Sequence, residues 1–245
     1  VVLAVIAMGC ASTAGPPEPP EPVDADSVWD PWEGFNRGMF WFNEKADIYV
    51  LRPAAVGWDF VLPDIVQTAL TDIYANARFP IVFLNDLLQG KWVQASQDLG
   101  RFALNTTLGL GGSLDPAKEA GWEAHNEDFG QTLGYWGVPP GPYLVIPFLG
   151  PSNARDTLGR AADSATLVYP YFVVWYINAA ITAPNVLNTR AQFIEEIDDD
   201  RRTALDFYAF QRNAYMDYRK NLVNDSEEDE EETGGEALYF FDEDE

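Results

Sequence analysis

Cysteine, histidine and basic residues are all scarce in this chain of 245 residues, which has one cysteine, Cys10, and one histidine, His125. A lone cysteine rules out a disulfide framework, so the stability of the fold must come from packing. Fifteen lysines and arginines face 39 aspartates and glutamates, which gives a formal net charge of -24. We expect no nucleic-acid partner, because phosphate binding requires a basic surface.

The residues of a hydrolase are also missing. The chain has no Gly-x-Ser-x-Gly motif and only one histidine to serve as a base, so we expect no enzyme. One group of possible metal ligands consists of Glu123, His125, Glu127 and Asp128. Their spacing is more typical of a solvated turn. Asp198 to Asp200 lack the glycine and ligand spacing of an EF-hand, so we expect an exposed helix junction there, and neither a metal nor a cofactor.

A long uninterrupted apolar run is absent as well. Residues 129–154 and 164–189 contain no charged side chain, but prolines interrupt both segments. A spanning helix takes about 20 apolar residues, whereas the apolar pieces here, such as 143–149 and 171–181, would as helices cross about half a bilayer. Proline-broken helices can lie in one leaflet if the protein satisfies the freed backbone groups. The alternative interpretation of these two charge-free segments is that they form the buried core of a soluble domain.

The position of Cys10 indicates a lipid anchor. It lies between an apolar run, residues 1–9, and a proline-rich stretch, and small Gly9 precedes it as signal peptidase II requires. We expect residues 1–9 to be the end of a lipoprotein signal peptide whose start is missing, and Cys10 to be acylated. Two or three acyl chains hold a protein stably on a bilayer. Residue 11 is alanine and not aspartate, which under the lipoprotein sorting rule of enteric bacteria favours transport to the outer membrane. A buried or free thiol is the alternative.

The negative charge is concentrated in the tails. Residues 10–27 combine the cysteine with repeated prolines, which predicts a semi-rigid extended tether. Residues 223–245 form an acidic tail with twelve acids and no base from Asp225 onward. This tail is too polar to bury a core and is expected to be disordered. The folded domain is therefore predicted to cover residues 28–222.

Helical periodicity dominates this domain. Asp30, Pro31 and Glu33 predict a helix start with a capping box, and one apolar stripe follows on Phe35, Met39, Phe42, Ala46 and Tyr49. Two more helices are expected between residues 79 and 108, with a break at Gly90. The inner face of the second is predicted to be Trp92, Ala95, Leu99, Phe102 and Thr106. Residues 190–222 repeat the pattern with an interruption at 198–200. We expect an all-α body with one or two short hairpins.

Five arginines lie in otherwise apolar or aromatic contexts: Arg37, Arg52, Arg101, Arg155 and Arg160. Guanidinium groups suit lipid phosphate, so these residues are candidate headgroup contacts. The alternative is internal pairing with Asp47, Asp98, Asp156 or Asp163. Gly109, Gly111 and Gly112 follow a predicted helix and indicate a turn that is also a candidate hinge.

Several ordered motifs carry a resemblance to a known family. They are Asp30-Pro31-Trp32-Glu33-Gly34-Phe35-Asn36-Arg37, Arg52-Pro53, Leu88-Gln89-Gly90, Arg101-Phe102, Gly109-Leu110-Gly111-Gly112, Phe129-Gly130-Gln131-Thr132-Leu133-Gly134, Gly141-Pro142-Tyr143, Arg155-Asp156 and Thr189-Arg190-Ala191-Gln192. Over about residues 28–222 the chain resembles the MlaA family, also called VacJ. The long acidic tail and the proline tether depart from the family pattern.

This resemblance implies a ring-shaped helical body embedded in the inner leaflet of the outer membrane, facing the periplasm. It further implies an amphipathic channel that removes mislocalised phospholipid from the outer leaflet and passes it to a soluble periplasmic carrier of the MlaC type, which maintains lipid asymmetry. Trimeric porins are the other implied partners. A structural lipoprotein that scaffolds porins or the envelope without lipid passage is the competing hypothesis.

Overall fold

The computed structural model of the protein describes residues 28–166 and 175–225, so Cys10, the tether and the tail beyond 225 lie outside it. Its first half contains α1 (Glu33–Ala46), a π-helical segment (Asp47–Leu51), α2 (Arg52–Val61), α3 (Asp64–Gln89), α4 (Trp92–Thr107) and α5 (Pro116–Glu119). The second half contains α6 (Phe129–Tyr135), β1 (Tyr143–Ile146), β2 (Gly150–Asn153), α7 (Ala154–Thr166), α9 (Trp175–Gln192), α10 (Ile194–Thr203) and α11 (Phe207–Asn224). The predicted all-α class with a short hairpin is confirmed.

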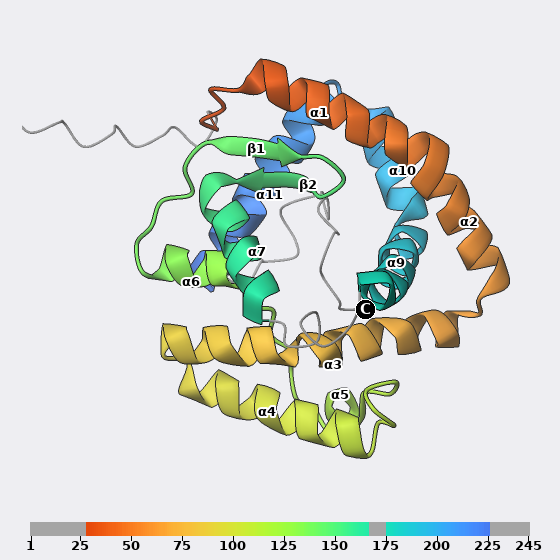
Figure 1. Ribbon diagram of the computed structural model, residues 1–245, viewed down its shortest axis with the longest axis vertical. Helices are drawn as coiled ribbons and strands as arrows, with labels where there is room; N and C mark the ends of the chain where they lie inside the picture. The colour runs from red at the N-terminus through yellow and green to blue at the C-terminus, as the bar shows by residue number, and fades with distance from the viewer. Residues whose placement is uncertain (1–27, 167–174, 226–245) are drawn as a thin grey trace, which may run out of the picture.

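The helices are arranged in a ring (Figure 1). Helices α1 and α2 form one side, α3 crosses the opposite side, and α6, α7 and the hairpin complete the circuit. Helix α9 packs against both α2 and α3 on the inner side, and α11 packs against α6 and β2. Helices α4 and α5 lie against α3 on the outside. Among the described helices, none has the length and apolarity needed to cross a membrane.

Helix α1 starts two residues later than the sequence predicts. Trp32 occupies the N-cap position without a side-chain bond to the helix, so the predicted capping box does not form. The carboxylate of Asp30 instead accepts hydrogen bonds from Asn36 Nδ2 at 2.7 Å and from the hydroxyl of Tyr208. Its side chain is almost fully buried, and these partners satisfy it where water does not reach. A long-range contact has therefore replaced the local cap.

Gly90 separates α3 from α4, as predicted. Its φ of +77° lies in the left-handed region that glycine adopts without a steric penalty, and Lys91 N–H closes the last turn on Asp86 O at 2.9 Å. Helix α3 is longer than expected, because it begins at Asp64 and continues through Pro80. Helix α4 ends in the predicted turn, where Gly111 and Gly112 also have positive φ.

The apolar piece 143–149, considered above as half of a membrane helix, is a strand and a turn. Strand β1 pairs with β2 in antiparallel register, from Tyr143 opposite Asn153 to Ile146 opposite Gly150. Flanking prolines leave too few residues to nucleate a helix, and Val145 and Ile146 are β-branched. The helical interpretation of this piece was therefore wrong.

Two asparagines of α1 bind the free edge of β1. Asn36 donates to Tyr143 O and accepts from Val145 N–H, both at 3.0 Å. Asn43 does the same one step further along, with Ile146 O at 2.9 Å and Phe148 N–H at 2.8 Å. The small apolar core lies beside this contact and consists of Tyr143, Val145, Tyr208 and Tyr215. The hairpin is thus held between α1 and α11.

The interruption predicted at residues 198–200 does not occur. Helix α10 runs through it, because Asp198 and Asp199 pair with arginines three residues further along the same helix. The actual breaks are at Phe193 and at residues 204–206, where the Asp206 carboxylate accepts the N–H of Ala209 and caps α11.

Candidate functional site

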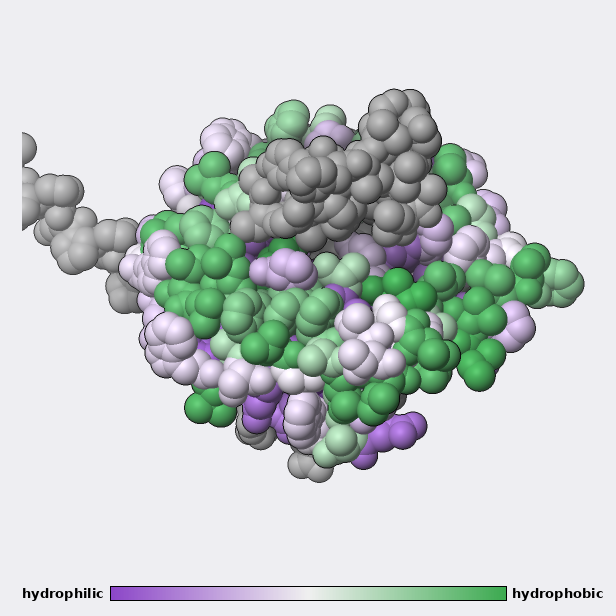
Figure 2. Space-filling model, turned by 60° about the horizontal axis from the view of Figure 1, so that its bottom comes forward, coloured by the Kyte–Doolittle hydropathy of each residue, from purple (hydrophilic) through white to green (hydrophobic). Residues whose placement is uncertain are grey.

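The outer surface of the ring carries most of the large apolar side chains. Exposed ones occur along α1 to α4 and in the following turns: Trp32, Phe35, Trp41, Phe42, Tyr49, Val50, Val56, Phe60, Val61, Ile65, Val66, Ile73, Leu84, Leu88, Trp92, Val93, Leu99, Leu108, Leu110 and Leu114. Figure 2 shows apolar areas spread across the α3 and α4 face and over the corner between α2 and α3. Soluble monomers rarely expose apolar patches of more than a few hundred Å², so this surface marks a contact with lipid or with another protein.

The buried interior between the elements of the ring is polar. Among the described residues, seventeen polar or charged residues are buried, against ten apolar ones of which four are alanines. The buried charged residues are Asp86, Asp98, Glu127, Arg155, Asp156, Arg190 and Arg219. Such residues are almost never fully buried in water-soluble domains unless they are paired. The distribution is therefore reversed relative to a protein that folds in water.

Helix α4 shows this reversal most clearly. The inner face predicted from its apolar stripe is right for Ala95, which is buried, and for Phe102, whose ring stacks on Phe79 of α3 with 4.3 Å between ring centroids. Trp92, Leu99 and Thr106 are exposed, and Trp92 retains 68% of its accessible surface. The other buried positions are Asp98 and Asn105, which bond to His125 and Asp115, so the buried face is turned from the apolar stripe toward these polar partners.

One charged cluster joins α10 to the start of the ring. Arg190 and Arg201 both bind the carboxylate of Asp47, at 2.8 and 2.9 Å. Arg52 and Arg201 bind Asp198, at 2.5 and 3.2 Å. The Arg52 guanidinium, which donates hydrogen bonds to Asp198, holds the pKa of that carboxyl below its usual value. These ion pairs tie the π-helical segment, α2, α9 and α10 together.

A second cluster is buried between α6, α7 and α11. Arg219 binds Asp128 at 2.5 Å and Asp156 at 2.9 Å, and Tyr215 donates to Asp156 at 2.8 Å. Burial alone would raise the pKa of Asp128, but the charge and hydrogen bonds of Arg219 outweigh it and lower that pKa to about 2. This arginine is only 9% exposed. A cation with two buried carboxylate partners makes this part of the inner wall rigid.

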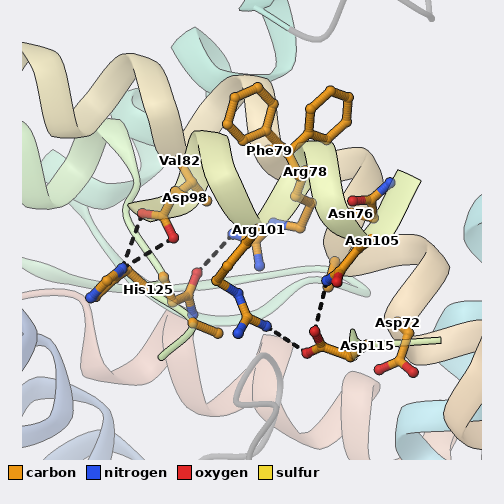
Figure 3. Close-up of a pocket in the computed structure, with 14 residues that line it drawn as sticks. Asp72, Asn76, Arg78, Phe79, Val82, Asp98, Arg101, Asn105, Asp115 and His125 are labelled. Atoms are coloured by element: carbon orange, nitrogen blue, oxygen red, sulfur yellow. Dashed lines mark hydrogen bonds and ion pairs between the residues drawn. The ribbon is translucent and has the colours of Figure 1, made fainter. Parts of the chain in front are cut away.

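A cavity of about 140 Å³ lies between α3, α4 and the loop that follows α5 (Figure 3). Arg101 crosses it, with bonds to Asp115 Oδ2 at 2.6 Å and to the carbonyl of Trp122. His125 Nδ1 contacts both carboxylate oxygens of Asp98 at 3.1 Å. Asp72 faces the cavity next to Asp115 with no bond drawn to it. The cavity thus offers charged groups of both signs.

The family model of the MlaA lipoprotein matches residues 28–222 of the chain. The chain belongs to the MlaA lipoprotein family. A relative in Escherichia coli, named intermembrane phospholipid transport system lipoprotein MlaA, is 34% identical over 226 residues, which cover 90% of this chain and 85% of that protein. The Haemophilus influenzae protein of the same name is 34% identical, with 80% of each chain covered. An uncharacterized protein of Rickettsia bellii is also 34% identical, over 80% of this chain and 77% of its own length.

A solved structure supports the same assignment. It is described as "Structural basis for maintenance of bacterial outer membrane lipid asymmetry", and it superposes with a TM-score of 0.70 at 34% identity. The match covers 80% of this chain and 99% of that one. The ring-shaped MlaA fold expected from the motifs is therefore confirmed.

The structure places the five candidate arginines of this MlaA chain in internal contacts. Arg37 binds Asp206, Arg52 binds Asp198, Arg101 binds Asp115 and Arg155 binds Asp156. Arg160 donates to the carbonyl of Pro151 at 3.2 Å. Internal pairing, the alternative interpretation, thus describes four of them, although only Arg155 uses an expected partner. Contact with a lipid headgroup stays a prediction for all five, and the structure does not bring them together at one site.

The candidate hinge is a tightly packed turn. A Cβ at Gly109 would approach Leu114 O to 2.3 Å, and one at Gly112 would approach the side chain of Asn76 to 2.6 Å. Gly111 has open space around it but a φ of +80°. These contacts give the glycines a structural role in the turn, and their role as a hinge stays a prediction.

The four possible metal ligands do not converge. His125 pairs with Asp98, Glu127 binds Lys91 and Gln89, and Asp128 binds Arg219. Within residues 28–166 and 175–225, no group of three or more ligating side chains lies close enough to hold a metal ion. The sequence analysis missed Asp86, Gln89 and Asn188, which are buried on α3 and α9. The sequence signal that could have identified them is weak: each is a polar residue on the side of a helix opposite its apolar stripe.

Proposed function

We propose that this protein is an outer-membrane lipoprotein that removes mislocalised phospholipid from the outer leaflet and passes it toward the periplasm. The observation that carries the proposal is the reversed polarity of the fold, with large apolar side chains exposed and charged groups buried. Family membership supports the proposal, since the Escherichia coli relative is named as part of an intermembrane phospholipid transport system.

The outer surface fits a body seated in one leaflet. Apolar side chains along α1 to α4 lose contact with water when the acyl chains surround them, at a gain of about 25 cal/mol per Å². Tryptophans and tyrosines among them, such as Trp41 and Tyr49, suit the boundary between acyl chains and headgroups. The inner leaflet of the outer membrane is the location that leads to the periplasm.

The inner surface fits the passage of a charged headgroup. A phospholipid that changes leaflets unaided must bring its headgroup through hydrocarbon, which costs tens of kcal/mol for an isolated charge in the ideal case. A passage through the ring that includes polar side chains would replace part of the lost hydration. In this proposal, phospholipid moves through the ring from the outer leaflet, where it is in excess, without an energy source. The passage is therefore passive.

Other components follow from this role. Lipidation of Cys10 would hold the ring in place, a soluble carrier of the MlaC type would accept the lipid, and a trimeric porin would surround the apolar face. The name of the relatives describes a transport system, which supports a chain that acts with partners. We propose no catalytic step.

Two measurements test this function together. Native mass spectrometry of the full chain after mild detergent extraction is expected to show bound phospholipid. A deletion strain is expected to accumulate surface phospholipid, restored by the wild-type gene and not by Cys10→Ala. Absence of bound phospholipid together with unchanged surface lipid in the deletion strain would instead support a scaffold for porins or the envelope.

A further inference from the structure

The cavity between α3, α4 and the 115–126 loop has an unbalanced lining. Three aspartates, Asp72, Asp98 and Asp115, face two arginines, Arg78 and Arg101. With His125 neutral, the lining therefore carries one more negative than positive charge. A ligand with only negative charge is disfavoured here, and a cation or a zwitterion is favoured.

Asp72 is the carboxylate of the lining that has no bonded partner within the described part of the chain, although the charges of Lys118 and Arg101 act to lower its pKa. Asp115 is bound by Arg101 and Asn105, and Asp98 by His125, but Asp72 forms no hydrogen bond or ion pair with the described residues. Burial, and secondly the neighbouring Asp115, raise the pKa of Asp72 to about 6. The carboxyl is therefore ionised at neutral pH, in a place where a positive group would stabilise it.

Donors for a phosphate lie within the same cavity. Arg101 has five N–H groups, and the described residues use only its two terminal nitrogens, at Trp122 O and Asp115. His125 Nδ1 contacts both carboxylate oxygens of Asp98, so Nδ1 carries the proton of the neutral ring, and Nε2 is an acceptor that does not donate to a phosphate. In Figure 3, Arg101 lies between His125 at one end and Asp72 and Asp115 at the other.

The size of the cavity restricts the ligand further. A volume of about 140 Å³ corresponds to on the order of five water molecules, which suits a small polar group and not an acyl chain. The apolar side chains of Ile73 and Leu99 lie exposed nearby on α3 and α4, where acyl chains could rest. A divalent cation would need more ligands than Asp72 and Asp115 supply.

We propose that this cavity binds an ammonium–phosphate group, the headgroup chemistry of an amino-phospholipid, with the ammonium at Asp72 and the phosphate at Arg101. This inference rests on the proposed function for its lipid source and refines it. It assigns the protein a preference for zwitterionic over anionic phospholipid. The same group in a free phosphodiester would bind by the same contacts.

The test uses the full chain in detergent, mixed with equal amounts of phosphatidylethanolamine and phosphatidylglycerol and analysed by native mass spectrometry. The wild type is expected to retain phosphatidylethanolamine about tenfold better, the ratio expected for one extra charge-assisted hydrogen bond. Asp72→Asn is expected to remove this preference. Asp64→Asn makes the same change on an exposed turn of α3 and is expected to keep it.

Separate outcomes distinguish the two proposals. Bound phospholipid with no headgroup preference, or a preference that survives in a folded Asp72→Asn protein, would overturn the cavity proposal and leave lipid passage standing. Calorimetry with soluble glycerophosphoethanolamine provides the second arm. If no phospholipid binds but this compound binds in an Asp72-dependent way, the cavity proposal holds for a free phosphodiester and lipid passage fails. If neither binds, both are wrong.

Discussion

The outer surface and the inner wall of the ring obey opposite rules. On the outer surface, Phe60 and Trp92 are exposed although water would disfavour them. On the inner wall, Arg219 and Asp156 are buried and hold each other in place. The difference indicates that lipid or another protein covers the exposed apolar surface, and that ion pairs provide in the interior part of what apolar packing provides in a soluble domain.

Removing one charge from the inner wall is expected to have the largest effect. Arg219→Met leaves Asp128 and Asp156 buried without their cation, so the free energy of unfolding should fall by about 3–5 kcal/mol. Denaturant unfolding in detergent measures the loss. Arg202→Met is the control, because the pair of Arg202 with Asp199 is exposed and is expected to contribute about 0–1 kcal/mol. Equal losses in the two variants would remove the distinction between inner and outer charges.

A polar substitution on the outer surface is expected to affect membrane binding and not folding. Phe60 is 90% exposed at the end of α2, and Phe60→Ser should weaken binding to phospholipid vesicles by about 1.5–3 kcal/mol. Vesicle co-sedimentation measures this change. Leu205 is fully exposed too, but it adjoins the charged α10, so Leu205→Ser should bind as the wild type does. If Phe60→Ser binds vesicles unchanged, this corner does not lie in the membrane.

The buried carboxyl of Asp86 should make the free energy of unfolding depend on pH. It is fully buried, neither carboxylate oxygen has a described partner, and burial together with nearby Asp98 raises its pKa to about 8 from 3.8. The folded state therefore holds a proton that the unfolded chain releases, so the free energy of unfolding falls as pH rises from about 4 to about 8.

Asp86→Asn is neutral at every pH and should remove this slope. At pH 8 the variant is expected to be more stable than the wild type by about 1–3 kcal/mol, and at pH 4 the two should be alike. Denaturant unfolding across this pH range checks the prediction. A variant that is less stable than the wild type at pH 8 would show that the ionised carboxylate is compensated.

The smallest effect on stability is expected in the turn after α4, where exposed and packed residues alternate. In the turn after α4, Leu110 is exposed while Gly112 packs against Asn76. A Cβ at Gly111 meets nothing within 4 Å, so Gly111→Ala should cost only the strain of its left-handed backbone, about 1 kcal/mol. The melting temperature measures this cost. If phospholipid transfer by the folded variant equals that of the wild type, the turn does not act as a hinge.

The sequence predicted local features well and long-range polar contacts poorly. Gly90, the turn from Gly109 to Gly112 and the apolar stripe of α4 all follow from local chemistry. The direction of that stripe could not be predicted, because periodicity locates an apolar face without saying whether protein or lipid covers it. Asp30 and Asp156 each also have a partner more than fifty residues away, at Tyr208 and Arg219, and no local pattern connects these pairs.

The asparagines Asn36 and Asn43 also protect the hairpin from unwanted partners. An uncovered strand offers a row of free amide and carbonyl groups to which another chain can add, a common route to aggregation. Each carboxamide supplies one donor and one acceptor, as a neighbouring strand would. Helix α1 therefore imitates a third strand, and no second copy of the chain can extend this two-stranded sheet from that side.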